Sequence, residues 1–503
     1  MLLSRYNLRN VTSKKLELPN EAMFELPEKV LQFGTGVLLR GLPDYFIDKA
    51  NQQGIFNGRI VVVKSTSKGD SDAFEKQDGL YTLCVRGIEK GNKVEENIIC
   101  SSISRVLSAR QDWAEVLECA HNPQMQIIIS NTTEVGIQLV NEDFRKHPPV
   151  SFPAKLLAFL HERYIAFDGS SQSGMVILPT ELINNNGTKL ESIVLELAHL
   201  NLLDEGFIEW LENCNHFCNT LVDRIVPGFD SMIQKEVEQK LGLKDELLIV
   251  SEVFRLWAIE GNKTVAGILS FAKVDNGIVI TEDITLFKEL KLRMLNATHT
   301  LSCAAAFLSG IDTVKAGMED AVFSSLISDL MMDEIAPAIP NDAALLQAKD
   351  FGNKVLERFR NPFIQHHWFS ISMNYTQKMK TRAIPLLINY HKIFNQVPEN
   401  FTSCFAAYLL FMKPTHENGG QYFGTNAGVE YLINDEKANY YSNLWTKFDV
   451  DTIVNIVLQD TDLWDADLTQ VVGFESEVKE KLKMMLSDGV LAVLQSKKML
   501  QIK

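Results

Sequence analysis

Short, uninterrupted apolar runs alternate with amphipathic stretches in the first half of the chain. The runs are EKVLQFG (28–34), GRIVVVKST (58–66), MQIIISNTT (125–133) and GMVILPTEL (174–182), and they are rich in Val and Ile. A strand that is apolar on both faces is typical of a parallel sheet covered by helices on both sides. The stretches between the runs have helical character, so the order is strand, helix, strand. We therefore predict an α/β domain with a mostly parallel, doubly wound sheet over residues 1–283.

The pattern changes after GIVIT (277–281), where strand-like runs give way to helical periods. Long stretches such as DAALLQAKDFGNKVLERF, NFTSCFAAYLLFM and FESEVKEKLKMMLSDG repeat apolar positions three and four residues apart. Between them lie breakers, including KPTHENGGQYFGTNAG. We predict an all-α domain over residues 284–503.

Length and composition agree with this division and exclude several classes. A chain of 503 residues exceeds one ordinary core, and 46% hydrophobic with 22% charged residues is a globular composition. A net charge of -15 argues against a general nucleic-acid binder. The seven cysteines show no CxxC pair, which indicates reduced thiols without a disulfide framework or a thiolate zinc site. With no apolar run of ~18 residues and an N-terminus that turns polar early, we expect no membrane span and a cytoplasmic protein, monomeric or a small homo-oligomer.

The first apolar run leads into FGTGVLLRG (33–41), a glycine-rich loop. Gly34 and Gly36, with Thr35 between them, match the first two glycines of a dinucleotide fingerprint, while Gly41 replaces its third. Glycine turns are common, but this one follows the first strand of a βαβ unit and opens a helix, where anions bind. We therefore predict that the α/β domain is of the Rossmann type and binds a dinucleotide.

The identity of that dinucleotide stays open on the residues alone. The second run ends in Lys64-Ser65 and continues to Lys68 and Asp70, without the acid that usually binds the ribose of NAD. Ser65 and Asp70 are candidates for the ribose end, whereas the two lysines suit a 2′-phosphate. Tyr45 and Lys49 form a Y-x-x-x-K pair directly after the glycine loop, and we interpret them as packing and surface residues.

Three polar residues interrupt the apolar pattern of KLRMLNATH (291–299). On an α-helix, Lys291, Asn296 and His299 fit within an arc of roughly 140° and can point to one place. A lysine usually reaches solvent, and a lone His or Asn on a helix is more often structural. The spacing alone is therefore a weak indication of chemistry.

Five segments together are similar to the mannitol dehydrogenase family of polyol-specific long-chain dehydrogenases. They are FGTGVLLRG (33–41), QDGLYTL (77–83), TTEVG (132–136), FCNTLVDRIVP (217–227) and KLRMLNATH (291–299). T-x-VDRI-x-P is close to the family signature, and Lys-x4-Asn-x2-His is the family's catalytic spacing.

The resemblance implies an oxidoreductase that uses NAD and no metal. Lys291 would be the general acid/base, Asn296 would hydrogen-bond the oxygen that gains charge, and His299 would orient substrate hydroxyls. Burial beside a cationic nicotinamide lowers the pKa of a lysine toward neutrality, which suits proton transfer. Thr133 and Glu134 would lie beside the cofactor. The adjacent His366-His367 pair cannot point one way on a helix and offers no metal site.

Two segments depart from the mannitol branch and resemble the tagaturonate reductase branch. LPTELINNNG (178–187) replaces a Cys-Asp-Asn triplet, with Leu182 at the aligned Asn, so Asn185 or Asn186 would take over as donor. SISMNYTQKMKTRAIP (370–385) replaces a D-G-S-x-K-x-P string. The branch implies reduction of the ketone of D-tagaturonate to D-altronate.

A sugar acid needs a cation for its carboxylate, and Lys378, Arg382 and Arg255 are the candidates, each of which is otherwise a surface or helix-end charge. A fructuronate reductase and a mannitol-type polyol dehydrogenase remain alternatives with the same chemistry. A dinucleotide sensor without turnover, or an epimerase or lyase that retains its nicotinamide, are alternatives of another class.

Overall fold

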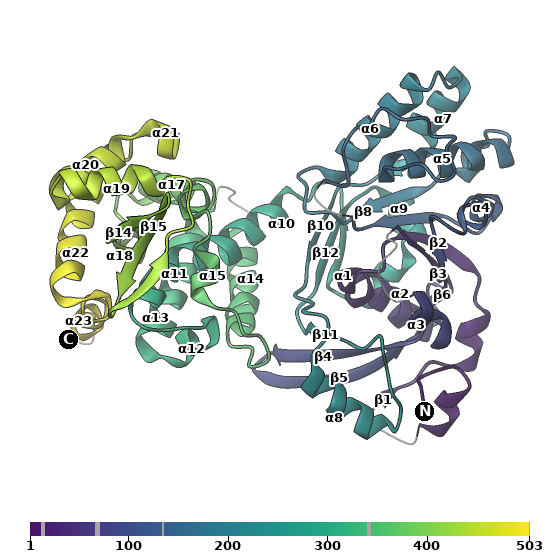
Figure 1. Ribbon diagram of the computed structural model, residues 1–503, viewed down its shortest axis with the longest axis horizontal. Helices are drawn as coiled ribbons and strands as arrows, with labels where there is room; N and C mark the ends of the chain where they lie inside the picture. Colours follow the sequence, from purple (N-terminus) through teal and green to yellow (C-terminus); the bar gives the residue numbers. More distant parts are fainter. Residues whose placement is uncertain (12–15, 66–70, 133–134, 340–343, 502–503) are drawn as a thin grey trace. The chain divides into compact units, whose positions relative to one another are not determined.

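The computed structural model describes residues 1–11, 16–65, 71–132, 135–339 and 344–501 (Figure 1). The chain divides into two compact units. The first contains residues 1–87 and 92–284, and the second contains residues 88–91 and 285–503. Among the described residues, no helix is both long and apolar enough to cross a bilayer.

A six-stranded sheet forms the centre of the first unit. Its order is β6-β3-β2-β7-β8-β9, and every neighbouring pair is parallel. The bounds are β6 (Ile103–Ser108), β3 (Arg59–Lys64), β2 (Glu28–Phe33), β7 (Ile127–Ser130), β8 (Val176–Pro179) and β9 (His216–Phe217). The predicted parallel sheet is confirmed.

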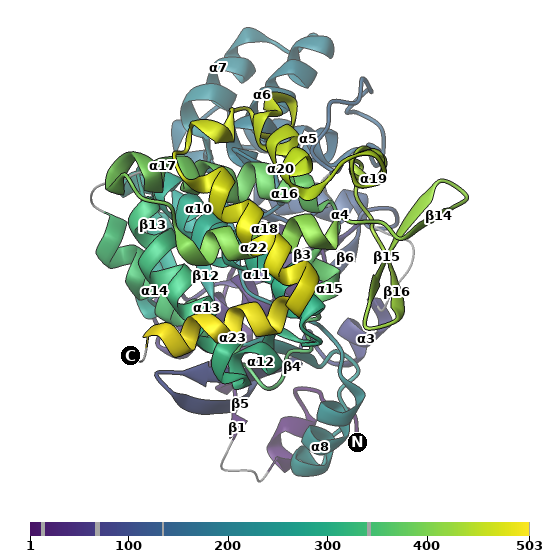
Figure 2. The same cartoon turned by 90° about the vertical axis from the view of Figure 1, so that its left-hand side faces the viewer.

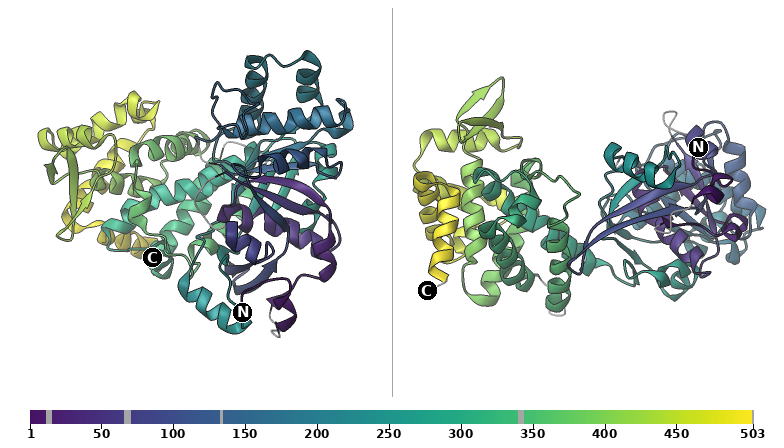
Figure 3. Two further views of the ribbon diagram at one scale, coloured as in Figure 1. Left: turned by 45° about the vertical axis from the view of Figure 1, so that its right-hand side comes forward. Right: turned by 90° about the horizontal axis from the view of Figure 1, so that it is seen from below.

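Both faces of this sheet are buried, as the continuous apolar runs predict. Alternate residues of β2 point to opposite sides: Val30 packs in the core that contains α2 (Pro43–Gln52), and Leu31 packs in the core that contains α5 (Phe152–Ala166). The second core also takes side chains from α4 (Trp113–Glu118), α6 (Asn186–Leu200) and α7 (Glu205–Cys214). Figure 3 shows the strands with these helices around them.

Two smaller sheets complete the first unit. One has the order β1-β5-β4-β11, and the other has the order β10-β12-β13, with β10 and β12 antiparallel. The bounds are β1 (Leu16–Glu17), β4 (Tyr81–Glu89), β5 (Asn92–Cys100), β11 (Ile249–Glu252), β10 (Thr220–Asp223), β12 (Leu256–Glu260) and β13 (Ile278–Thr281). The core around α2 also contains side chains of β4, β11 and β12, among them Leu83, Ile249 and Trp257.

The second unit is mainly helical. Helix α11 (Thr298–Leu308) is buried along nearly its whole length and packs on α18 (Glu399–Phe411), which in turn packs on α22 (Phe474–Asp488) (Figure 2). Further helices are α10 (Thr285–Leu290), α12 (Val314–Glu319), α13 (Ala321–Asp329), α14 (Ala344–Phe359), α15 (Trp368–Ile371), α16 (Tyr375–Lys378), α17 (Ile384–Phe394), α19 (Ala438–Lys447), α20 (Val450–Gln459) and α23 (Val490–Gln501).

The second unit also contains a three-stranded antiparallel sheet, so the term all-α needs correction. The strands are β14 (His416–Asn418), β15 (Gln421–Asn426) and β16 (Val429–Leu432). Two-residue turns with positive φ at both positions, Gly419-Gly420 and Ala427-Gly428, join them, as is usual in tight hairpins. The strands are largely exposed and carry no apolar alternation, so the sequence showed only the turns. The α/β domain followed by a helical domain is otherwise confirmed.

Candidate active site

The glycine loop lies at the point where the strand order of the large sheet reverses. From β2 the chain proceeds to β3 and β6 on one side, and then returns to β7 and β8 on the other. Ligands of open α/β sheets bind at the carboxyl ends of the strands at such a switch point. Gly34 follows β2 and Asn131 follows β7 at this point, and the Asn131 N–H donates to the Phe33 carbonyl over 3.2 Å.

The backbone of the loop requires glycine and leaves space above it. Gly34 has a φ of +133°, and a Cβ there would lie 3.2 Å from the Asn131 carbonyl oxygen and 2.9 Å from Leu39 Cδ1. A Cβ at Gly36 would meet nothing within 4 Å. A crowded first glycine and an open second one are what close approach of a pyrophosphate to the backbone needs. The residues present therefore fit a dinucleotide.

Gly41 has a packing role and does not line this open space. A Cβ at Gly41 would lie 2.9 Å from Val226 Cγ2, and its carbonyl oxygen accepts a hydrogen bond of 2.5 Å from Arg224 Nη1. Helix α1 (Val37–Gly41) is only five residues long, so its dipole contributes little and the expected helix-end anion site is a weak one. The LVDRIVP segment thus contacts the end of the glycine loop at Gly41, through the Arg224 hydrogen bond and the Val226 side chain.

Only one of the residues predicted to bind the far end of the dinucleotide, Ser65, lies within the described part of the chain. Ser65 is exposed at the carboxyl end of β3, next to β2. Asp70, Thr133 and Glu134 lie outside the described residues, so their predicted cofactor contacts stay predictions.

A buried glutamate that the sequence analysis missed organises the ends of β7 and β8. Glu181 is 4% exposed and accepts hydrogen bonds from Ser130 Oγ (3.1 Å), the Thr132 N–H (2.8 Å) and Thr132 Oγ1 (3.0 Å). Asn131 Nδ2 binds the Thr180 carbonyl over 3.1 Å. These bonds connect the ends of β7 and β8. The signal in the sequence was the polar pair Thr180-Glu181 directly after an apolar strand.

Asn186, a predicted substrate ligand, is a structural residue. It is 1% exposed, and its Nδ2 donates to the carbonyl oxygens of Pro179 (2.9 Å) and Glu181 (3.1 Å). Its Oδ1 accepts from the N–H groups of Gly187 (2.9 Å) and Thr220 (2.9 Å). Because the amide is fully used, this prediction is corrected: Asn186 anchors the loop that starts α6.

Arg255, the third cation considered for the carboxylate, also has internal partners. Its Nε donates to Asp275 Oδ2 over 2.8 Å and its Nη1 to the Val253 carbonyl over 2.8 Å. Lys49 Nζ binds the same Asp275 oxygen over 2.7 Å, so Lys49 is a partly exposed residue in an ion pair with a buried carboxylate and not a plain surface residue. Tyr45 is buried under these cations and packs as predicted.

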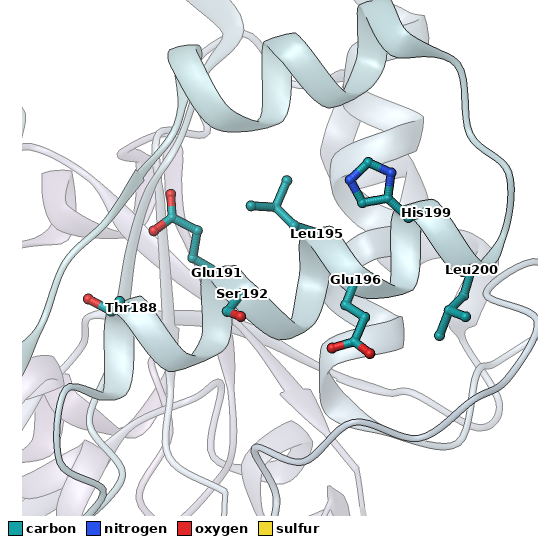
Figure 4. Close-up of a pocket in the computed structure, with 7 residues that line it drawn as sticks. All are labelled: Thr188, Glu191, Ser192, Leu195, Glu196, His199 and Leu200. Carbon is teal, nitrogen blue, oxygen red and sulfur yellow. The ribbon is translucent and has the colours of Figure 1, made fainter.

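A shallow groove on the outer face of α6 contains none of the predicted site residues (Figure 4). Its lining comes from that one helix: Thr188, Glu191, Ser192, Leu195, Glu196, His199 and Leu200. No group of histidines, cysteines and carboxylates among the described residues is arranged to hold a metal ion.

Lys291 and Asn296 lie on a π-helical turn, η6 (Lys291–Ala297), between α10 and α11. A π-helix closes its hydrogen bonds from i to i+5, and such turns are frequent at functional sites. Residues five apart therefore lie one above the other, which brings Lys291 and Asn296 onto one face more closely than the predicted α-helix would. Both side chains are partly exposed, whereas the flanking Met294 and Leu295 are buried.

His299 follows on α11 inside an aromatic cage. Its ring stacks on Phe359 with centroids 4.3 Å apart, and the rings of His366 and Trp368 stand edge-on at 4.9 and 5.9 Å. Burial, and then the neighbouring His366, lowers the pKa of His299 well below its usual value. The ring is therefore neutral at physiological pH, and its buried Nε2 has no hydrogen-bond partner among the described residues. His367 points elsewhere, to Asp312 (3.0 Å), as expected for adjacent residues.

Lys378 and Arg382 lie beside this helix, on α16 and the π-helical turn η9 (Met379–Ala383). Lys378 Nζ donates to the Ile371 carbonyl (2.9 Å) and Arg382 Nη1 to Thr300 Oγ1 (3.2 Å). Burial lowers the pKa of both groups, and Arg382 adds to the lowering at Lys378. Within the described part of the chain neither forms an ion pair. The third cation of the segment, Lys380, pairs with Asp465 over 2.7 Å.

Arg293 joins the two π-helical turns. It lies on η6 between Lys291 and Asn296, and its Nη1 donates to the carbonyl oxygens of Thr381 (2.7 Å) and Arg382 (2.8 Å) on η9. Glu289 holds the same guanidinium through Nε over 2.9 Å. The second unit thus brings together five predicted residues: Lys291, Asn296, His299, Lys378 and Arg382.

Comparisons with known proteins agree with this architecture. The sequence profile of the mannitol dehydrogenase Rossmann domain matches residues 28–273, and that of the mannitol dehydrogenase C-terminal domain matches residues 283–486. The chain belongs to the mannitol dehydrogenase family. The predicted family and the predicted enzyme class, an oxidoreductase, are both confirmed.

Within the mannitol dehydrogenase family, altronate oxidoreductases are close relatives. The chain is 37% identical to that of Pectobacterium carotovorum over 93% of this chain and 96% of the relative. It is 39% identical to that of Bacillus subtilis, over 89% and 90%.

Two solved structures share the fold. Mannitol 2-dehydrogenase of Pseudomonas fluorescens, in a ternary complex with NAD and D-mannitol, is similar over 99% of both chains, with a TM-score of 0.67 and 21% identity. A substrate-free D-sorbitol dehydrogenase is similar over 98% of this chain and 100% of its own, with a TM-score of 0.79 and 20% identity.

Proposed function

We propose that the protein is an NAD-dependent oxidoreductase that interconverts D-tagaturonate and D-altronate, with Lys291 as the general acid/base. The observation that carries the proposal is the cluster in the second unit, where Lys291, Asn296 and His299 lie beside two cations that have no carboxylate partner among the described residues. The identity of 37% and 39% to two altronate oxidoreductases over most of the chain supports the same substrate.

Lys291, Asn296 and His299 have different roles in the proposed reduction. Bound NADH supplies the hydride that adds to the ketone carbon. The Lys291 ammonium donates a proton to the carbonyl oxygen as it gains charge, and in the reverse direction the amine takes that proton from the hydroxyl. The Asn296 amide donates a hydrogen bond to the same oxygen without adding charge. Neutral His299 donates to or accepts from a substrate hydroxyl through its unpaired Nε2.

Arg382 and Lys378 give the site its preference for an acid. A cation removed from water without a counter-ion is unfavourable, and a substrate carboxylate supplies the counter-ion. Arg382 presents a planar guanidinium that suits bidentate binding, and Thr300 Oγ1 orients it. Fructose or mannitol would leave both charges unpaired.

The open loop at Gly34–Gly36 is the proposed place for the pyrophosphate of NAD. Residues 1–283 would then form the dinucleotide-binding domain and residues 284–503 the substrate domain. We further expect the enzyme to be cytoplasmic and either monomeric or a small homo-oligomer.

A direct assay tests the proposal. Purified protein is mixed with NADH and D-tagaturonate, D-fructuronate or D-fructose, and the loss of NADH absorbance is followed. We expect the fastest turnover with D-tagaturonate and the slowest with D-fructose. Faster reduction of D-fructuronate would favour a fructuronate reductase, and of fructose a mannitol-type enzyme. NADH binding without turnover would mean a sensor, and a changed uronate without net NADH oxidation would mean an epimerase.

A further inference from the structure

A buried carboxyl group lies beneath the glycine loop and has no part in the mechanism above. Asp44 on α2 and Gln32 on β2 are both 0% exposed. Gln32 Nε2 lies 3.3 Å from the Gly34 carbonyl oxygen and 3.3 Å from Asp44 Oδ2, so its two hydrogens serve both acceptors. The Gln32 amide therefore connects Asp44 with the first glycine of the loop.

The bonding of this pair is incomplete if Asp44 is ionised. Asp44 Oδ1 and Gln32 Oε1 are both buried acceptors without a donor among the described residues. A buried carboxylate without a bonded cation is strongly unfavourable, whereas a protonated acid has the one donor that the pair lacks. With a proton on Oδ1, the carboxyl and the amide can form two antiparallel hydrogen bonds. Burial accordingly raises the pKa of Asp44 to about 8.

We propose that Asp44 is a protonated carboxylic acid in the working enzyme and a positioning residue for the dinucleotide: through Gln32 it holds the Gly34 carbonyl inward, so that the Thr35 N–H faces the pyrophosphate. The identity of the ligand, a dinucleotide, rests on the proposed function. The positioning itself rests on the contacts of Gln32 and the geometry of the loop.

The direction of the Gly34 carbonyl determines the direction of the Thr35 N–H. In a planar trans peptide the N–H of Thr35 points opposite to the C=O of Gly34. The Gly34 N–H donates to the Val63 carbonyl over 3.0 Å, so contacts fix this residue on both sides. Within the described part of the chain the Thr35 N–H has no hydrogen-bond acceptor, and space is open over Gly36. Backbone N–H groups of this kind bind phosphate oxygens in glycine loops.

Other charged and titratable groups also face Asp44. Arg40 on α1 favours the ionised form, while Asp48 on α2 favours the neutral form. Tyr81 on β4 and Cys100 on β5 are in the same cluster, and burial raises the pKa of each well above its usual value, so both stay neutral when Asp44 titrates. Ionisation of Asp44 therefore removes a donor and places a negative charge under the proposed pyrophosphate site. Both effects weaken binding.

The test compares Asp44→Asn, which keeps the shape and a donor, with Asp44→Leu, which keeps neither. Asp48→Asn is the matched control, because Asp48 is on the same helix and 1% exposed but binds Ser101. NADH affinity is measured by fluorescence at roughly pH 6.5 and roughly pH 9.5, below and above the pKa of Asp44. We expect the wild type and Asp48→Asn to lose affinity about tenfold at the higher pH. Asp44→Asn should change by less than about twofold, and Asp44→Leu should bind about fivefold more weakly at low pH, as expected for one lost hydrogen bond.

A second measurement does not depend on the cofactor. With 15N-glycine labelling, the amide resonance of Gly34 should titrate with a midpoint near the pKa of Asp44 in the wild type. In Asp48→Asn it should titrate with a lower midpoint, because Asp48 favours the neutral acid, and in Asp44→Asn it should not titrate. A Gly34 resonance that does not move, or that moves equally in Asp44→Asn, would overturn the inference. Equal pH dependence of NADH binding in the wild type and Asp44→Asn would also overturn it. If Gly34 titrates with Asp44 but NADH does not bind at any pH, the proposed function fails and the hold of Asp44 on the loop stands.

Discussion

Arg293 donates a hydrogen bond of 2.8 Å to the carbonyl oxygen of Arg382, and so a residue of the Lys291–Asn296 turn fixes the backbone of the segment that carries Lys378 and Arg382. Arg293 is buried and makes a second bond to the neighbouring Thr381 carbonyl. Hydrogen bonds of Arg293 therefore connect the turn that carries the proposed acid–base group with the segment that carries the proposed carboxylate site. This arrangement suits a reaction in which a carbonyl and a carboxylate of the same small molecule must be held at a fixed separation.

Replacing Lys291 by Ala should greatly reduce turnover while leaving the dinucleotide site intact. The loss of a general acid/base typically reduces the rate by ~10²–10⁴. We expect kcat with D-tagaturonate to fall by that factor and the Kd for NADH to change by less than about twofold. Lys288→Ala, one turn earlier on α10, serves as the control and should retain turnover. Wild-type kcat in Lys291→Ala would contradict the mechanism.

Asn296→Ala should have a milder effect than Lys291→Ala. The amide is proposed to stabilise the developing oxyanion, and removing one such donor costs roughly 3 kcal/mol. The loss should appear in kcat and in kcat/KM to the same extent, because the bond forms only as charge develops. A rise in KM with unchanged kcat would instead show that Asn296 binds the ground state.

Arg382→Met and Lys378→Met should harm turnover of D-tagaturonate much more than any residual turnover of fructose. Only the acid has a carboxylate for these cations, and a desolvated charge that loses its partner costs several kcal/mol. The matched control is Lys380→Met, which removes a cation of the same segment that pairs with Asp465. Equal losses on both substrates would show that Lys378 and Arg382 support the fold and not the carboxylate.

His299 should make stability sensitive to acid. Burial lowers the pKa of His299 well below 6.5, its usual value in an unfolded chain, so below about pH 6.5 the unfolded state binds the extra proton. The contribution is fully present above that pH and is lost as the pH falls toward the folded pKa. The difference in Tm between the wild type and His299→Gln should therefore shift against the wild type from roughly pH 7.5 to roughly pH 5. His367→Gln, whose ring is exposed beside Asp312, is the matched control variant.

NADH should be preferred to NADPH, although Lys64 and Lys68 suit a 2′-phosphate. The expectation follows the resemblance to the family. The ratio of kcat/KM for NADH and NADPH tests this preference. A ratio of about tenfold or more in favour of NADPH would indicate that Lys64 and Lys68 bind a 2′-phosphate and would contradict the expectation.

The sequence predicted the large sheet well because its strands are buried on both faces. β3 is buried at every position, and an unbroken β-branched run can hardly form anything else in an α/β chain. The small sheet β14-β15-β16 was missed for the opposite reason. Its strands bury almost nothing, so hairpin turns alone specify them, and a cluster of turn residues is equally typical of a loop.

The structure gives the positions of the predicted site residues, whereas their roles stay predictions. Lys291, Asn296, His299, Lys378 and Arg382 are brought together by the fold, but the assumed α-helical spacing is replaced by a π-helical turn that no local propensity marks. Asn186 was wrong as a ligand because an amide gives no sign in sequence of whether it faces a substrate or the backbone around it. Glu181 and Asp44 were missed because a carboxyl group that is buried by tertiary contacts looks like a surface one in the chain.

The π-helical turn at Lys291–Ala297 makes the site depend on chain length as well as on residue type. Such a turn holds one residue more than an α-helical turn, so it is equivalent to a one-residue insertion in a regular helix. Removing Leu292 would place Asn296 four residues after Lys291, which is about one turn of a regular α-helix, so both side chains would stay on one face while the π-helical turn between them was lost. The five-residue spacing of Lys291 and Asn296 therefore needs the π-helical turn, because a regular α-helix would place residues five apart about 140° from each other. In a relative, a gap of one position in this segment would indicate that the turn is absent and the shared face is kept.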